Sequence, residues 1–454
     1  MATVQERSKL TPVDRSYSEP YKNYIGYNCP RIAFAGDSIT AITPYSTASA
    51  LGNHPYAPSS WLLPMLGQRA RTDPTLIFGV SGDTSTQLLA RIDAVCNSVA
   101  DIVVILIGTN DINNASGTTL LSRFTTYKSN MLTMIDRLIA AGKTVIIQPP
   151  LPRNVATAEN RNILIQMRNW TNSLAWIGKR NLFIADASVD YGDPLSTTYA
   201  PRSGYDYDGL HPQARGAYEI SKSLYRVLDK ILPPFSQQLF SVADVYEATY
   251  NPTGNLLTNG ILDGTSGTKS TTQGLTPTGD VATSWGTSFS APYSGGTALS
   301  GLTVVSSKGV TTDGRIENIL TVSGSYTGDV DSYFGISQAV ASLSRIQAGD
   351  AIEAMGEIVL DVSAAELPLV SPRITMAMTF PTATAFRVSD MHHVALGYSP
   401  KEGYTMLMRT PRYVVPETPS ILSFGAHMIP RQGANTLPNN AVIRFRSMSL
   451  RKII

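Results

Sequence analysis

The sequence predicts an α/β domain followed by an all-β domain. The first would have helices on both faces of a mainly parallel sheet, and the second would be an antiparallel β-sandwich. Three observations support this. The chain has 454 residues, 43% of them hydrophobic, which is enough for more than one buried core. Up to about residue 235, short apolar runs alternate with amphipathic stretches. Beyond that point Gly, Ser and Thr dominate, and strand-like segments replace the helical ones.

The expected strands of the first domain are continuous apolar runs, a pattern typical of strands covered on both faces. They lie at 32–35, 76–80, 102–107, 144–147 and 182–185. Amphipathic helices are expected over 84–95, 122–141 and 214–232, where apolar side chains recur at helical spacing. Gly142 and Pro233 follow the last two of these helices and predict where they end.

In the second domain, apolar and polar side chains alternate between turn-rich stretches. The clearest expected strands cover 357–362, 374–380 and 441–450. We therefore expect four segments along the chain. They are an N-terminal extension (1–27), the α/β domain (28–235), a linker (236–250) and the β-sandwich (251–454).

Composition excludes several classes of protein. The formal net charge is +2 and no block of like charge is present, which disfavours a nucleic-acid binder. Two cysteines, Cys29 and Cys96, are too few for a disulfide framework. The apolar runs are too short to span a membrane, and the first residues carry no apolar segment of a signal peptide. We expect a soluble protein that is cytoplasmic at synthesis and that would leave the cell only by a non-classical route.

Two motifs follow the first two strands. Strand 32–35 leads into Gly36-Asp37-Ser38-Ile39-Thr40. A serine at the carboxyl end of a parallel strand lies where α/β folds place reactive groups, although a serine that caps a helix gives the same pattern. The next strand ends in Val80-Ser81-Gly82. Because glycine has no side chain, the Gly82 N–H can approach a ligand closely; an ordinary strand–helix turn is the alternative.

Two further motifs complete the set. Strand 102–107 leads into Gly108-Thr109-Asn110-Asp111, where the Asn110 amide can donate to an oxyanion or tie down its own loop. Asp208-Gly209-Leu210-His211-Pro212 precedes the last helix. If this turn folds back at Gly209, Asp208 can hold the His211 tautomer that accepts a serine proton. A single histidine is more often structural than catalytic, but four such motifs in one order favour catalysis.

Together the four motifs resemble the SGNH (GDSL-like) hydrolase superfamily over roughly residues 28–233. The run 80–85, followed by Leu89-Ala90-Arg91, is similar to its thioesterase and lysophospholipase branch, with Ile39 where the name-giving motif often has Leu. The resemblance implies a three-layer, flavodoxin-like α/β/α domain and a serine esterase without a cofactor. It also implies roles for single residues: nucleophile Ser38, base His211, orienting partner Asp208, and oxyanion donors Ser38 N–H, Gly82 N–H and the Asn110 side chain.

The substrate is indicated less directly. Tyrosines gather before the Asp-His motif, at Tyr191, Tyr199, Tyr205 and Tyr207. Tyr205 and Tyr207 are candidates for binding sugar rings, since tyrosine offers both an apolar face and a hydroxyl; loop packing is the alternative. Residues 45–60 form a long stretch rich in small residues, and no long apolar lid segment is evident, which disfavours a long-chain lipid.

The opening run 255–260 and the closing run 443–450 of the β domain resemble carbohydrate-binding jelly-roll modules. Candidate stacking residues are Trp285, Tyr293, Tyr326 and Tyr333, with core packing as the alternative. Asp329 and Asp331 could bind Ca²⁺, but an exposed polar turn is commoner. His392 and His393 would point to opposite faces of a strand, so no metal site is predicted.

We therefore expect a serine esterase that removes acyl groups, O-acetyl groups foremost, from an acylated polysaccharide. The composition also suits a bacteriophage tail or surface protein, which would function as a homo-oligomer or in a virion assembly. Two alternatives remain open. One is a thioesterase- or lysophospholipase-type hydrolase of small acyl esters whose β domain is only structural. The other is a non-catalytic glycan-binding virion or adhesion protein.

Overall fold

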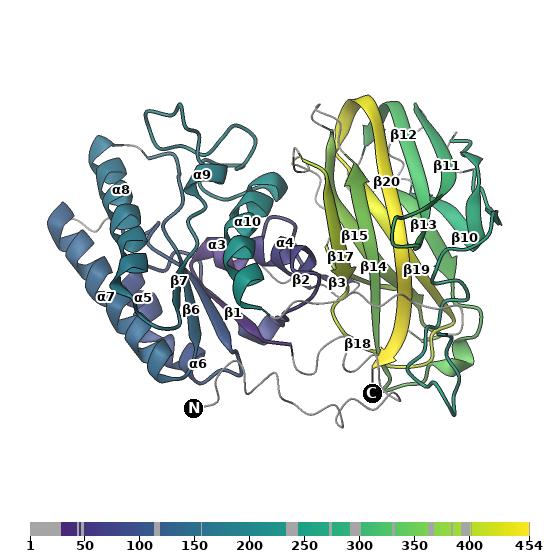
Figure 1. Ribbon diagram of the computed structural model, residues 1–454, viewed down its shortest axis with the longest axis horizontal. Helices are drawn as coiled ribbons and strands as arrows, with labels where there is room; N and C mark the ends of the chain where they lie inside the picture. The colour runs from purple at the N-terminus through teal and green to yellow at the C-terminus, as the bar shows by residue number, and fades with distance from the viewer. Residues whose placement is uncertain are drawn as a thin grey trace.

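A computed structural model of the chain describes residues 29–42, 45–46, 50–112, 119–155, 157–232, 244–271, 275–290, 301–328, 332–361, 367–382, 385–391, 400 and 402–453. Figure 1 shows an α/β unit beside an all-β unit, in the order that the sequence predicts. The expected fold class is confirmed. The expected seam near residue 235 lies outside the described residues, so the domain boundaries stay predictions.

The α/β unit is built on a five-stranded sheet in which every pairing is parallel, in the order β4-β1-β5-β6-β7. The strands are β1 (Ile32–Gly36), β4 (Ile77–Gly79), β5 (Ile102–Leu106), β6 (Thr144–Gln148) and β7 (Leu182–Ile184). Numbered within this sheet, the order is 2-1-3-4-5, that of flavodoxin-like folds. The chain reverses its winding direction between β1 and β5, and the segments that follow these two strands lie at the carboxyl edge of the sheet, where ligands bind in open α/β folds.

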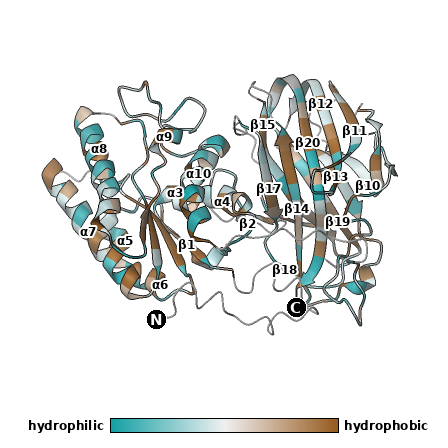
Figure 2. Ribbon diagram, in the orientation of Figure 1, coloured by the Kyte–Doolittle hydropathy of each residue, from teal (hydrophilic) through white to brown (hydrophobic). Residues whose placement is uncertain are grey.

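Helices cover both faces of this sheet. They are α3 (Ser38–Ala41), α4 (Pro58–Met65), α5 (Ser85–Ala90), α6 (Ile92–Cys96), α7 (Leu120–Ala140), α8 (Ala158–Ser173), α9 (Ser188–Tyr191) and α10 (Ala214–Ile231), with 3₁₀ turns at Pro74–Leu76 and Leu174–Ile177. Successive strand residues point to opposite faces. Accordingly, Val103 packs with the α5–α8 side and Val104 with the α4–α10 side. Figure 2 shows these apolar strands between the two helical layers.

The helices differ from the sequence-based expectation in two ways. The single helix expected over 84–95 is two helices, α5 and α6, which meet at Arg91 (φ −116°). The Arg91 guanidinium donates to the carbonyls of Phe78 and Gly36 and to the Asp83 carboxylate, so it ties this joint to the ends of β1 and β4. α4 and α8 were not expected. α4 is buried almost all round, which leaves no amphipathic pattern to detect.

The β unit is a sandwich of two sheets. One has the order β2-β3-β16-β15-β19-β13-β10-β8, in which β2 is Tyr45–Ser46 and β3 is Ala50–Gly52. The other has the order β17-β14-β20-β12-β11-β9, with β18 pairing β14. Its strands are β8 (Ser266–Thr268), β9 (Thr278–Gly279), β10 (Val281–Ser290), β11 (Leu302–Val310), β12 (Ile316–Gly328), β13 (Tyr333–Ala339), β14 (Ala351–Asp361), β15 (Leu369–Thr379), β16 (Phe386–Ser389), β17 (Tyr404–Arg409), β18 (Tyr413–Val414), β19 (Ile421–Pro430) and β20 (Gly433–Ile453), with a 3₁₀ turn at Leu343–Arg345. The three strands that the sequence predicted lie mostly within β14, β15 and β20.

The two units share strands and a core. β2 (Tyr45–Ser46) and β3 (Ala50–Gly52) precede α4 in the chain, yet β3 pairs in parallel with β16 at the edge of a sandwich sheet. Trp61 of α4 is fully buried in the same apolar cluster as the sandwich core. Polar contacts also cross the junction: the Gln68 amide donates to the Leu407 carbonyl (2.6 Å), and Glu402 accepts from the Tyr218 hydroxyl (2.9 Å). The sequence did not indicate this junction.

Among the described residues, no helix is long and apolar enough to cross a membrane.

Candidate active site

Three neighbouring strand ends converge at the carboxyl edge of the parallel sheet. β4, β1 and β5 are adjacent, and the segments that follow them carry Gly82, Ser38 and Asn110. Hydrogen bonds hold these loops together. The Val80 N–H donates to the Gly36 carbonyl (3.1 Å), and the Asn110 side-chain amide donates to the Asp83 carbonyl (3.0 Å). The expected gathering of the motifs at one edge is what the structure describes.

Ser38 is the first residue of the short helix α3, directly after β1. Asp37 caps this helix, since its carboxylate accepts from the Ile39 N–H (3.0 Å). Gly36 allows β1 to lie close to β5, because a Cβ at this position would come within 2.2 Å of the Leu106 carbonyl oxygen. The side chain of Asp37 is 1% exposed. Burial, with smaller contributions from Asp111 and Asp83, raises the pKa of the Asp37 carboxyl to about 7.

A hydrogen-bonded chain joins Ser38 to the Asp-His loop, 173 positions away in the sequence. Ser38 Oγ lies 2.8 Å from His211 Nε2, and His211 Nδ1 lies 2.7 Å from Asp208 Oδ2. A carboxylate on Nδ1 favours the tautomer whose Nε2 is free to accept a proton. The arrangement can therefore deprotonate the serine hydroxyl and return the proton to a leaving group.

The Asp208 carboxylate also organises its own loop. Its Oδ1 accepts from the backbone N–H groups of Leu210 (3.0 Å) and His211 (2.7 Å). Partial burial acts to raise the pKa of Asp208, but these hydrogen bonds and the one from the His211 ring outweigh it, so the pKa lies below its usual value. The loop folds back at Gly209, which has a positive φ of 83°. There the Gly209 carbonyl accepts from the Asn154 N–H (2.8 Å).

The other two expected site residues, Gly82 and Asn110, lie in the loops that neighbour the Ser38–His211–Asp208 hydrogen bonds. Gly82 has φ +84°, and a Cβ added there would meet no atom within 4 Å, so the space beside its Cα is open. Asn110 is half-buried, and one N–H of its amide is used by Asp83. The second N–H of that amide is what a ligand could use.

Several residues that support the loops of the site were not predicted from the sequence. The Asp83 carboxylate is buried and paired with Arg91. The Arg153 guanidinium donates to the Thr109 carbonyl (2.9 Å) and so fixes the loop that carries Asn110. Tyr56 lies 5.7 Å from Tyr207, which in turn lies 5.6 Å from His211, measured between ring centroids. None of these residues has a sequence pattern that separates it from ordinary loop residues.

The structure corrects two of the three predicted substrate-binding residues. Trp285 is 1% exposed; it packs edge-on against Phe424 in the sandwich core and donates its indole N–H to the Asn259 carbonyl. Tyr205 is 4% exposed and packs beside Tyr191. Both rings are covered by the protein itself, so neither can stack on a sugar. Tyr207 is different, since it is half exposed and lies beside His211.

The remaining candidates are of two kinds. Tyr326 is buried, with its hydroxyl donating to the Pro368 carbonyl, and Tyr333 is partly buried against His427. The others lie outside the described residues: Tyr293, Asp329, Asp331, His392 and His393. Within the described part of the chain, no three His, Cys, Asp or Glu side chains are grouped so that they could hold a metal ion.

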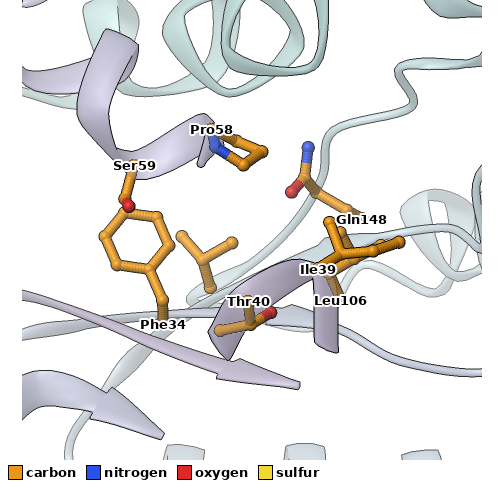
Figure 3. Close-up of a pocket in the computed structure, with 8 residues that line it drawn as sticks. Phe34, Ile39, Thr40, Pro58, Ser59, Leu106 and Gln148 are labelled. Atoms are coloured by element: carbon orange, nitrogen blue, oxygen red, sulfur yellow. The ribbon is translucent and has the colours of Figure 1, made fainter. Parts of the chain in front are cut away.

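A small cavity lies behind α3, between the sheet and α4. Its volume is about 20 Å³, and Phe34, Ile39, Pro58 and Gln148 are among the residues that line it (Figure 3). Such a volume holds about one water molecule. Neither Ser38 nor His211 is among the residues that line it.

Residues 34–218 match the model of the GDSL-like Lipase/Acylhydrolase family. These residues form a GDSL-like hydrolase domain. Because members of this family are serine ester hydrolases, the protein is a serine hydrolase that acts on ester bonds. No curated protein matches the chain.

Several solved structures are similar to the GDSL-like domain. A GDSL-like lipase from Bacteroides thetaiotaomicron VPI-5482 is 20% identical over 44% of this chain and 89% of its own, with a TM-score of 0.34. A lipase/acylhydrolase from Enterococcus faecalis is 21% identical over 46% of this chain and 100% of its own (TM-score 0.32). A variant of an acetyl-xylooligosaccharide esterase from Geobacillus Stearmophilus is 20% identical over 47% and 99% (TM-score 0.36).

Proposed function

We propose that the protein removes acyl groups, O-acetyl groups foremost, from a glycan. Ser38 is the nucleophile, His211 the general base and acid, and Asp208 the carboxylate that orients His211. The Ser38 N–H, the Gly82 N–H and the Asn110 side chain stabilise the oxyanion. The observation that carries this proposal is the continuous hydrogen-bonded chain Ser38 Oγ–His211 Nε2–His211 Nδ1–Asp208 Oδ2, with distances of 2.8 and 2.7 Å.

The reaction follows from these positions in two steps. Ser38 Oγ attacks the ester carbonyl while His211 Nε2 accepts its proton, and the carbonyl oxygen becomes an oxyanion held by the three N–H donors. The tetrahedral intermediate then collapses, and the His211 imidazolium protonates the departing alcohol. A water molecule then attacks the carbonyl carbon of the acyl-enzyme while His211 accepts its proton. The bond to Ser38 Oγ breaks, His211 returns the proton to Ser38, and the carboxylic acid is released.

One feature of the site supports a polar substrate. Tyr207 lies beside His211 and is half exposed, and its hydroxyl can hydrogen-bond to hydroxyl groups of a sugar. The O-acetyl esters of a glycan lie beside such hydroxyl groups.

Two assays test the proposal. Hydrolysis of p-nitrophenyl acetate by the native chain should fall by a factor of about 10³ or more in Ser38→Ala, since only binding and residual electrostatics remain. Equal turnover in the two proteins would refute the role of Ser38. Acetate release from an acetylated glycan should exceed hydrolysis of a long-chain acyl thioester. The opposite order would refute the glycan substrate and leave the esterase intact.

A second function is favoured by one observation. Trp285 and Tyr326 are buried in the sandwich core, which removes two of the aromatic side chains expected to bind sugar there. The β-sandwich can accordingly be structural, and the enzyme a hydrolase of small acyl esters or thioesters. A pull-down of the Ser38→Ala protein with an acetylated polysaccharide separates the two. Retention supports the glycan substrate, and full flow-through supports the small-ester hydrolase.

A place in a bacteriophage particle, as a tail or surface protein, stays a prediction from the sequence. In that setting a deacetylase would trim a surface polysaccharide during attachment. The prediction is checked by mass spectrometry of purified particles produced by the source of the gene; absence of the chain from every structural fraction would contradict it.

A further inference from the structure

We propose that the β-sandwich is part of the catalytic apparatus of the GDSL-like domain. It holds the segment 50–61 in place, and Tyr56 of this segment, acting through Tyr207, keeps the His211 ring in the orientation that serves Ser38. Tyr56 and Tyr207 are thus positioning residues. This inference rests on the proposed roles of Ser38 and His211, and it is independent of which ester is the natural substrate.

The sandwich anchors this segment before Tyr56. After Ser38 the chain leaves the α/β unit as β2 and β3, and β3 joins the edge of the eight-stranded sandwich sheet. The pairing is parallel and aligns Ala50 with Arg387 and Leu51 with Val388. Main-chain pairing to a rigid sheet fixes both the position and the direction of the segment.

The sandwich also anchors the segment after Tyr56, through Trp61. The Trp61 indole N–H donates to the Pro55 carbonyl (2.7 Å), and its ring is fully buried. The ring packs edge-on against Tyr218 of α10 and Tyr404 of β17, with centroid separations of 5.6 and 6.3 Å. Tyr56 therefore lies on a short turn whose first end pairs with the β unit and whose second end is held between α10 and β17.

From this turn a stack of aromatic rings leads to the histidine. The Tyr56 and Tyr207 rings are 5.7 Å apart with an interplanar angle of 29°. The Tyr207 and His211 rings are 5.6 Å apart and nearly parallel, at 15°. The Tyr207 N–H also donates to the His211 carbonyl (3.1 Å), so backbone and ring act on the same residue.

Stacking supplies a restraint that the hydrogen bonds of His211 lack. Asp208 and Ser38 hold the two ring nitrogens and fix the ring within its plane, whereas a nearly parallel neighbouring ring limits its tilt out of that plane. The electron-rich face of a phenol also attracts the imidazolium that forms when His211 accepts the serine proton. Losing the Tyr207 ring should therefore slow proton transfer and make the protonated histidine less favourable.

Other charged groups near His211 come from several elements, and a pH profile has to be interpreted with them. Asp206 and Asp208 lie on its own loop, and Asp37 lies beneath Ser38 at the start of α3. Arg153 acts electrostatically on Asp208 and Asp37 from the segment after β6. None of the variants proposed below alters these groups.

The test compares Tyr207→Leu and Tyr56→Leu with Tyr207→Phe and Tyr56→Phe, using p-nitrophenyl acetate. We expect kcat to fall roughly 2- to 30-fold in Tyr207→Leu, less in Tyr56→Leu, and little in Tyr56→Phe. Tyr207→Phe keeps the ring, so it should recover most of the kcat that Tyr207→Leu loses. The acid limb of the kcat/KM profile should move to lower pH in Tyr207→Leu, by about half a unit. Tyr250→Leu, at a tyrosine that is 90% exposed, is the matched control and should leave kcat and profile unchanged.

The contribution of the sandwich is tested at Tyr404, which lies in β17 and contacts Trp61 rather than the site. Tyr404→Leu should lower kcat of the folded protein, and combining it with Tyr56→Leu should lower kcat by less than the product of the two single effects. Folding is checked for each variant by circular dichroism and thermal midpoint, and kcat is measured well below that midpoint.

The outcomes are distinguishable. If the native chain hydrolyses no ester and Ser38 is not labelled by an organophosphate, the proposed function fails. If the native chain is active while Tyr207→Leu and Tyr56→Leu match it in kcat and pH profile, the positioning role of the stack fails alone. If both tyrosines matter and Tyr404→Leu has no effect on kcat, the contribution of the β-sandwich is refuted.

Discussion

Replacing Asp208 by Asn tests the proposed role of the carboxylate, because the substitution keeps the shape and changes the donor pattern. In the native chain, Oδ2 of Asp208 lies 2.7 Å from His211 Nδ1, and Oδ1 accepts the Leu210 and His211 N–H groups. The amide oxygen of the substituted side chain can keep the two backbone hydrogen bonds. Its NH₂ group would then donate to His211 Nδ1, which leaves the proton on Nε2, facing Ser38. This tautomer cannot accept the serine proton.

The size of the effect depends on two features of the site. In a buried Ser-His-Asp triad the same substitution lowers kcat by about 10⁴. Here the Asp208 side chain is 42% exposed, so water can partly compensate for the loss of the carboxylate charge. The amide of the substituted Asn would still hold His211 in the tautomer that carries its proton on Nε2. We therefore expect kcat for p-nitrophenyl acetate to fall by roughly 10² to 10⁴, the lower part of this range reflecting solvent access.

The assay compares kcat/KM of Asp208→Asn with that of Asp206→Asn across pH 5–9. Asp206 lies on the same loop, and its carboxylate accepts from the Gly209 N–H rather than from His211, so Asp206→Asn is the matched control. Its kcat/KM should stay within a few-fold of the native value. If Asp208→Asn keeps more than half of the native kcat/KM, the carboxylate does not select the tautomer and this reasoning is wrong.

Two further predictions concern the oxyanion and the sandwich core. With p-nitrophenyl acetate as substrate, Asn110→Ala should lower kcat about 100-fold or more and change KM little. This loss corresponds to roughly 3 kcal/mol of transition-state stabilisation. An unchanged kcat would show that Asn110 does not stabilise the oxyanion. Burial raises the pKa of Asp390 to about 7, so the native state, which prefers the neutral acid, loses stability as pH rises from about 4 through about 7. Asp390→Asn can keep the acceptor for the Ile374 N–H and carries no charge, so its free energy of unfolding should match that of the native chain at pH 3.5 and exceed it by roughly 4 kcal/mol at pH 8. Equal stabilities at pH 8, measured by urea unfolding, would contradict the second prediction.

The strand-end motifs predict where the candidate site residues lie, because each motif depends on local sequence. Ser38, Gly82 and Asn110 each follow a continuous apolar run, and parallel strands bring their carboxyl ends to one edge. The distance between Ser38 and His211 in the chain is no obstacle, since the Asp208–His211 turn precedes a strongly amphipathic helix that packs on the same sheet. These features could be predicted from composition, order and spacing.

Side-chain burial and the contact between the two units could not be predicted in this way. A tryptophan or tyrosine in a β-rich segment has the same sequence pattern whether it faces a sugar or the core, and Trp285 faces the core. β3 is three residues long and lies in a stretch of small residues, so nothing local indicates that it pairs with β16, which begins only at Phe386. Both outcomes depend on tertiary packing, which local pattern does not encode.

The central claim is that Ser38 is a nucleophile activated by His211, and covalent labelling tests it most directly. The native chain is treated with diisopropyl fluorophosphate and examined by intact-mass and peptide mass spectrometry. The account predicts one adduct per chain, on the peptide that contains Ser38. An unlabelled protein, or an adduct on a different residue with Ser38 unmodified, would contradict it.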